Sequence, residues 1–145
     1  MKKIFIFPPN SLILADLVER FGHKPLMLQS QIRQRIMNPD IDSPPFNITE
    51  KDLKKGLNFV PVEAPSGIRG RMGIIGPLIE EAEAAIIIED AEYSFGCLGC
   101  TRAANLVKYL ISNKKVPLIR MNYPKNEEDA KSMVFEIKKF LESLN

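Results

Sequence analysis

The sequence lacks any apolar run long enough to cross a bilayer. No stretch approaches the roughly 18–20 uninterrupted apolar residues that a membrane-spanning helix needs, so we expect no membrane partner. The basic start, MKK, is typical of a signal peptide, but its apolar run from Ile4 to Phe7 ends at Pro8 and Pro9, and no small-residue cleavage site follows. These residues therefore predict the first buried strand of a cytoplasmic protein.

The sequence also lacks a large excess of charge of either sign, because 20 basic and 18 acidic residues leave a net charge of +2. Proteins that hold nucleic acid on a broad electrostatic surface are far more basic, so a nucleic-acid partner is disfavoured. Two cysteines and a single histidine are too few for a secreted disulfide scaffold or a histidine-rich metal cage. What is present is a globular composition, with 45% hydrophobic residues in 145, which excludes wholesale disorder and suits one domain over 1–145.

Apolar periodicity predicts alternating strands and helices, and hence an α/β protein. Continuous apolar runs predict four strands near Lys3–Phe7, Leu26–Gln29, Ala85–Glu89 and Leu118–Met121. The alternation favours a mostly parallel sheet in a three-layer domain, with a flavodoxin-like or Rossmann-like strand order 2-1-3-4. Asn58–Val62 is a candidate fifth strand at an edge. The expected core comprises Ile4, Ile6, Leu14, Val18, Ile86, Ile88, Leu106, Leu110, Ile119, Val134 and Ile137.

An irregular insert is expected at about 30–76. Within it, Thr49 followed by Asp52 resembles a capping box and predicts a short polar helix that stops at Gly56. Glycines then recur at every third position from Gly67 to Gly76, and each glycine inside a helix weakens it by about 1 kcal/mol relative to alanine. We therefore expect an irregular loop there, followed by a helix with Pro77 in its first turn.

The predicted strand order places a topological switch point between the first and third strands. Ligands of open α/β sheets bind outside the carboxyl ends of the strands at such a point. One loop that reaches it carries Asn10 and Ser11, and the other, Asp90 to Thr101, contains both cysteines. The sequence therefore predicts a site with polar side chains on one wall and thiols on the other.

The C-x-x-C pair of Cys97 and Cys100 is the sharpest chemical motif. It follows a buried strand and opens a helix, where free N–H groups lower the pKa of a thiol, so it predicts a dithiol redox site. The same pair supplies half of a zinc or iron–sulfur site whose other ligands must come from a second chain. Two small structural thiols are the remaining alternative. A phosphatase nucleophile would need arginine where Ala103 stands, and thioredoxin-type sites usually place proline where Leu98 and Gly99 stand.

Three further features suggest anion binding or structural roles. Gly96 and Gly99 beside a helix start allow backbone N–H groups to hold an anion. Arg69 and Arg71, set among glycines, predict a mobile loop that closes over a phosphate or carboxylate or docks a partner. The P-loop spacing is absent, which argues against ordinary ATP hydrolysis. His23 at a helix end is expected to be structural.

A family resemblance adds to these inferences. The stretch GIRGRMGIIGPLIEEAEAAIIIEDAEYSFGCLGCTRAANL and the N-terminal IFIFPPNSLILADLVERFGH resemble the archaeal methanogenesis marker proteins of unknown function, and most of all the fifth of them. The resemblance implies an anaerobic, cytoplasmic setting. Some marker proteins are thought to assist maturation or activation of methyl-coenzyme M reductase, whose nickel cofactor works only when strongly reduced. The resemblance assigns no reaction and no catalytic residue.

Two functional hypotheses follow, with a third behind them. The favoured one is a non-catalytic accessory or assembly factor that carries a dithiol and docks a protein partner, with a homodimer as one option. The competing one is a small thiol-redox enzyme, or a zinc- or iron–sulfur-dependent enzyme that takes ligands from a second chain. The third is a module that binds an anion or nucleotide.

Overall fold

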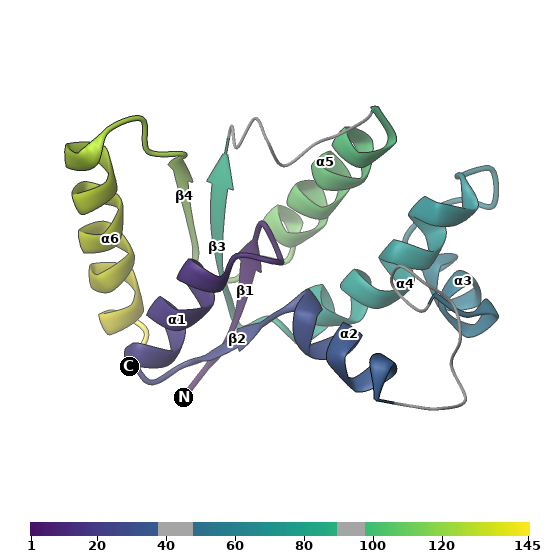
Figure 1. The fold of residues 1–145 in the computed structure, drawn as a ribbon, viewed down its shortest axis with the longest axis horizontal. Coiled ribbons are helices and arrows are strands. Elements are labelled where there is room, and N and C mark those ends of the chain that lie inside the picture. The colour runs from purple at the N-terminus through teal and green to yellow at the C-terminus, as the bar shows by residue number, and fades with distance from the viewer. Residues whose placement is uncertain (38–47, 90–97) are drawn as a thin grey trace.

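The computed structural model describes residues 1–37, 48–89 and 98–145, in which strands and helices alternate. The four strands are β1 (Lys3–Phe7), β2 (Lys24–Leu26), β3 (Ala84–Glu89) and β4 (Leu118–Asn122). They pair in parallel in the order β2-β1-β3-β4 (Figure 1). The α/β class and the predicted order 2-1-3-4 are therefore confirmed, and β1 and β3 are central neighbours.

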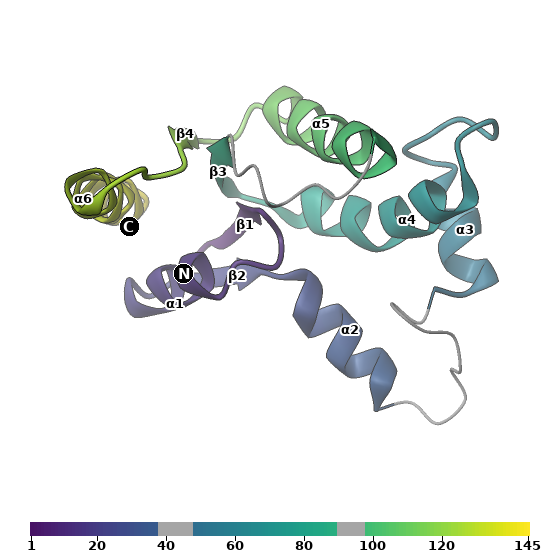
Figure 2. The ribbon, with the colours of Figure 1, turned by 45° about the horizontal axis from the view of Figure 1, so that its top comes forward.

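Helices cover both faces of this sheet (Figure 2). Their bounds are α1 (Leu12–Arg20), α2 (Leu28–Ile36), α3 (Glu50–Gly56), α4 (Ser66–Glu81), α5 (Leu98–Asn113) and α6 (Glu127–Glu142). One hydrophobic cluster joins a sheet face to α1 and α6, and a second joins the other face to α4 and α5. Among the described helices, none combines the length and apolar character that crossing a membrane requires.

Apart from Lys3 and Glu89 at their ends, the central strands β1 and β3 are apolar and buried at every position. In β1, Ile4 and Ile6 pack toward α1 and α6, whereas Phe5 and Phe7 pack toward α4 and α5. Because helices cover both faces of these strands, the alternation of a half-exposed strand disappears. This burial makes β1 and β3 the most predictable elements of the fold.

Several predicted details are wrong at the edges of the sheet. β2 ends at Leu26, and α2 begins at Leu28 where the second strand was expected to continue. Asn58–Val62 forms turns after α3, and the described sheet has no fifth strand. Val134 is 39% exposed, because the buried stripe of α6 runs through Ile137 and Leu141. Three other expected core residues are only partly buried: Leu106, Leu110 and Ile119.

The glycine-rich stretch is the largest correction, since it forms a helix and not a loop. α4 spans 16 residues and has Pro77 inside it, not in its first turn. A Cβ added at Gly73 would overlap the backbone carbonyl of Asp52 in α3, and one added at Gly76 would overlap the ring of Phe59. The glycines therefore let the backbones of α3 and α4 approach closely, and packing gained there offsets their poor intrinsic helix propensity.

The two ends of α4 have different neighbours. Toward its carboxyl end, Ile75, Leu78 and Ile79 join the cluster that covers the sheet. Toward its amino end, Gly70 lies against Ile48 and Leu53, and α4 extends beyond the sheet alongside α3 (Figure 1). α4 therefore extends the hydrophobic cluster of this sheet face to α2 and α3.

Candidate functional site

The carboxyl ends of β1 and β3 lie side by side, as the predicted switch point requires. α1 begins at this edge, directly after β1, and the amino end of α5 lies at the same end of the sheet (Figure 1). Ser11 caps α1, and its hydroxyl accepts the Leu14 N–H at 3.3 Å. Asn10 is exposed, and its carbonyl accepts a hydrogen bond from the Gln29 side chain at 3.0 Å. Asn10 and Ser11 thus lie at the carboxyl end of β1, and the Ser11 side chain is used as a helix cap.

The second wall lies largely outside the described residues. Gly96 and Cys97 are not described, and of Cys100 only the backbone is, in the first turn of α5 beside Gly99. No group of three or more histidine, cysteine or acidic side chains that could hold a metal occurs in the described part of the chain. The redox and metal hypotheses for the two cysteines therefore stay predictions.

Arg69 and Arg71 do not lie on a loop, so the prediction of a mobile wall is wrong. Both belong to the amino-terminal half of α4, and the carbonyl of Arg69 packs against Gly56 of α3. The Nε atom of Arg69 is buried and has no hydrogen-bond partner among the described residues. These arginines are held on a packed helix, where glycine serves close contact instead of flexibility.

His23 has the structural role that its position suggests. The side chain is 4% exposed, its Nδ1 accepts the Lys2 N–H at 3.2 Å, and its Nε2 lies 2.9 Å from the Leu141 carbonyl. Accepting at Nδ1 places the proton on Nε2, which then donates to that carbonyl. The ring links the start of β1 to the end of α6, and it lies away from any predicted ligand site.

A charged cluster at the end of β3 was not foreseen as a unit. The Glu89 carboxylate accepts from Lys108 at 2.6 Å and from Arg120 at 2.7 Å. The Lys108 ammonium lies 5.8 Å from the centre of the Phe7 ring, and Arg120 also donates to the Ser112 hydroxyl. Because every member has a partner, the cluster fastens α5 to β3 and β4.

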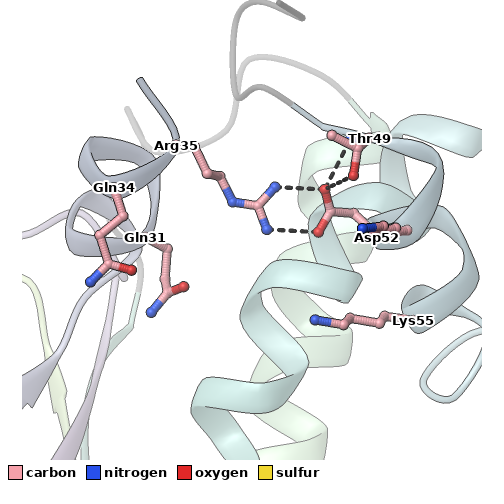
Figure 3. Close-up of a pocket in the computed structure, with 7 residues that line it drawn as sticks. Gln31, Gln34, Arg35, Thr49, Asp52 and Lys55 are labelled. Carbon is pink, nitrogen blue, oxygen red and sulfur yellow. Dashed lines mark hydrogen bonds and ion pairs between the residues drawn. The ribbon is translucent and has the colours of Figure 1, made fainter. Parts of the chain in front are cut away.

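A cavity of about 300 Å³ between α2 and α3 was missed altogether. Figure 3 shows the Arg35 guanidinium reaching from α2 to Asp52 of α3, with the side chains of Gln31 and Gln34 on the α2 side. The lining residues are Gln31, Gln34, Arg35, Thr49, Lys51, Asp52 and Lys55. The capping pattern Thr49–Asp52 was visible in the sequence, but nothing local indicated that α2 would pack beside it.

An ion pair forms one wall of this cavity. The Arg35 guanidinium donates to both carboxylate oxygens of Asp52, at 2.5 and 2.7 Å, in a two-pronged arrangement (Figure 3). The Thr49 N–H donates to the same carboxylate at 2.8 Å and the Thr49 hydroxyl at 3.0 Å, so the predicted capping box is confirmed. Asp52 is 2% exposed, and both of its carboxylate oxygens accept hydrogen bonds from Arg35 or Thr49.

The pKa of Asp52 reflects these contacts. Burial by itself raises the pKa of the carboxyl, but the hydrogen bonds from Arg35 and Thr49 outweigh it and lower the pKa from 3.8 to about 2. The hydrogen bond to Asp52 in turn raises the pKa of Arg35. Both groups are therefore charged at any pH near neutrality, and the pair is a fixed part of the cavity wall.

The comparisons with known proteins place the chain in a family. Residues 2–144 match the family described as uncharacterized protein conserved in archaea (DUF2112), and the chain belongs to it. The chain is also 61% identical, over 144 residues, to the uncharacterized protein MJ0404 of Methanocaldococcus jannaschii; the match covers 99% of this chain and 96% of that relative. No solved structure matches the chain. These matches confirm membership of an archaeal family of unknown function.

Proposed function

We propose that the chain is a cytoplasmic accessory or assembly factor associated with methanogenesis that acts on a protein partner through the dithiol of Cys97 and Cys100. The observation that carries the proposal is the position of Cys100 in the first turn of α5, which follows the central strand β3. The resemblance to the methanogenesis marker proteins and the relative in Methanocaldococcus jannaschii support the association. Maturation or activation of methyl-coenzyme M reductase is the process that this resemblance suggests.

Helix geometry supports the thiol chemistry. The first N–H groups of a helix have no partner within it, and the aligned peptide dipoles favour negative charge there. A cysteine in the first turn of the 16-residue α5 is therefore placed where a thiolate is stabilised. The dithiol would be the electron donor, and an oxidised partner protein the acceptor.

The proposed thiol–disulfide exchange takes two steps. One thiolate attacks a sulfur of the partner's disulfide, forms a mixed disulfide and releases the partner's other sulfur as a thiolate. The second cysteine then attacks the mixed disulfide and releases the partner as a dithiol. Cys97 and Cys100 end as an internal disulfide, and the partner gains the two electrons.

The surrounding residues would hold the partner segment or an anionic group beside the thiols. Asn10 and Ser11 would contribute from beside the start of α1, and Gly96 and Gly99 would contribute backbone N–H groups. Any contribution from Arg69 and Arg71 would come from the fixed surface of α4, since a closing loop is not available there. These residues would bind the partner, and the dithiol would carry out the thiol exchange.

A metal site is the second candidate, because two thiolates are half of a tetrahedral zinc or iron–sulfur set. The other ligands would come from a second chain, either a partner or another copy. A metal-bound dimer or complex with both cysteines protected would favour this candidate over thiol exchange.

The test is anaerobic purification followed by metal analysis, an absorption spectrum and a thiol titration. Thiol exchange is supported if the metal-free protein has two reactive thiols that oxidise reversibly to one internal disulfide, and if Cys97→Ser and Cys100→Ser each abolish that step. If the purified protein holds a metal and both variants lose it, the metal site is supported in place of thiol exchange. Two thiols that neither oxidise together nor hold metal would overturn both candidates, provided that circular dichroism shows the variants folded.

A further inference from the structure

We propose that the cavity between α2 and α3 is a binding site for a small phosphate-bearing anion. Every lining residue that the structure describes lies in or beside α2 and α3 (Figure 3), whereas Cys100 lies in the first turn of α5. The cavity is also separate from the switch point at which sequence analysis places an anion.

The lining of the cavity has a surplus of positive charge and of hydrogen-bond donors. Among the seven lining residues that the structure describes, Arg35, Lys51 and Lys55 are cations and Asp52 is the one carboxylate. The Asp52 carboxylate oxygens already accept from Arg35 and Thr49. From these described residues an entering ligand meets more hydrogen-bond donors than acceptors, which favours an oxyanion.

The two lysines are the open cations. Among the residues that the structure describes, neither Lys51 nor Lys55 forms an ion pair, whereas their neighbour Lys54 pairs with Glu50 at 2.7 Å. In Figure 3 the Lys55 side chain extends from α3 toward α2, on the side from which Gln31 projects. The amides of the lining glutamines can each donate two N–H groups to the same ligand.

The state of Arg35 favours phosphate over carboxylate. A carboxylate ligand gains most from a free guanidinium that can bind both its oxygens, but Asp52 already occupies that face of Arg35. The remaining cations are lysines, which attract an anion as compact point charges without a planar fork. A phosphate, with three or more oxygen atoms and up to two negative charges, uses several such donors at once.

The helix that carries the two lysines is packed on two sides. The Asp52 carboxylate accepts hydrogen bonds from Arg35, and the Asp52 backbone carbonyl lies closely against Gly73 of α4. The helix that presents Lys51 and Lys55 is therefore fixed on two sides before a ligand arrives, which limits the ordering cost of binding. The volume, about 300 Å³, is at the lower end for small-molecule sites and suits a phosphate monoester better than a dinucleotide.

The experiment titrates the full chain with inorganic phosphate, and in parallel with acetate and chloride at equal ionic strength, following amide shifts by NMR. We expect saturable binding of phosphate, with shifts in α2 and α3, and binding at least about tenfold weaker in the double variant Lys51→Ala and Lys55→Ala. Lys54→Ala is the matched control, since it removes the same charge from the same helix without touching the cavity, and it should change affinity less than about twofold.

Each other result counts against the proposal. Absence of saturable phosphate binding removes the site, and equal weakening by Lys54→Ala shows an unspecific charge effect. Acetate binding as tightly as phosphate overturns the choice of ligand. All three lysines are exposed, so the variants should stay folded; if the alanine pair unfolds, Lys51→Gln with Lys55→Gln gives the same decision. Cys97→Ser should leave phosphate binding unchanged, so failure of the proposed thiol function is distinguishable.

Discussion

Two regions of this molecule are held together by different means. In the sheet region, formed by the four strands with α1, α5 and α6, contacts come from large side chains such as Phe5 and Ile86, which are fully buried. In the α2–α4 region, formed by α2, α3 and the amino-terminal half of α4, apolar contacts are joined by a close backbone approach at Gly73 and by the partly buried pair of Arg35 with Asp52. Stability should therefore fall most when a buried side chain of the sheet region is shortened. In the α2–α4 region it should fall when a side-chain carbon is added at Gly73.

The largest expected effect is in the sheet region, at Ile86. Ile86→Ala removes a buried side chain from the centre of β3 and leaves a cavity, so the free energy of unfolding should fall by about 4 kcal/mol. Urea unfolding followed by circular dichroism measures the change. Val134→Ala, at a half-exposed position of α6, should change it by less than about 0.5 kcal/mol. Equal effects at the two positions would refute the assignment of the core.

The reverse test is to add one carbon in the α2–α4 region. Gly73→Ala places a methyl group against the Asp52 carbonyl, and separating α3 from α4 should cost about 3 kcal/mol. Gly67→Ala, in the same helix, meets open space and should leave stability unchanged or raise it by up to about 1 kcal/mol. Chemical denaturation of both variants measures the contrast, and a stabilising Gly73→Ala would show that the helices do not touch there.

Acid should weaken the α2–α4 region first. Asp52 has a pKa of about 2 when folded and about 3.8 when exposed, so its stabilising contribution is complete above about pH 5 and is lost as the pH falls through 2. The loss should be about 2 kcal/mol. Hydrogen exchange as a function of pH locates it, and Asp52→Asn should abolish this part of the acid dependence. Uniform loss of protection across both regions would contradict the expectation.

The smallest expected effect concerns the ion cluster of the sheet region. Glu89→Gln removes the charge that holds Lys108 and Arg120, and because this cluster is partly exposed the cost should be about 1 kcal/mol and should shrink with added salt. Unfolding at low and high ionic strength measures both properties. The exposed pair of Glu127 and Lys131 is the reference, and its loss should be close to neutral.

The same contrast explains what could be predicted from the sequence. β1 and β3 were predictable because burial on both faces leaves a local signature, and so was the cap of α3, since Thr49 and Asp52 are three residues apart. α4 was not, because the cost of its glycines is local whereas the compensating contacts come from α3. The cavity was missed for a similar reason: Arg35 and Asp52 meet only after two helices pack.

The end of β2 could not be predicted from the sequence for a different reason. Leu28 is buried in α2 as it would be in a strand, so an apolar residue alone did not distinguish the two. The candidate site was predictable as a place, the carboxyl edge between β1 and β3, from strand order alone. Its side-chain chemistry depends on Cys97 and Cys100 and stays a prediction.

The close contact of α3 with α4 also has a consequence at the level of the gene. Every glycine codon is one base change away only from other glycine codons, a stop codon or codons for residues that carry a Cβ. At Gly73 each such missense change introduces an atom for which the backbone of α3 leaves no room, whereas at Gly67 the same change meets open space. Selection should therefore hold the codon of Gly73 far more strictly than that of Gly67, and sequencing survivors of random mutagenesis at the two positions would show it.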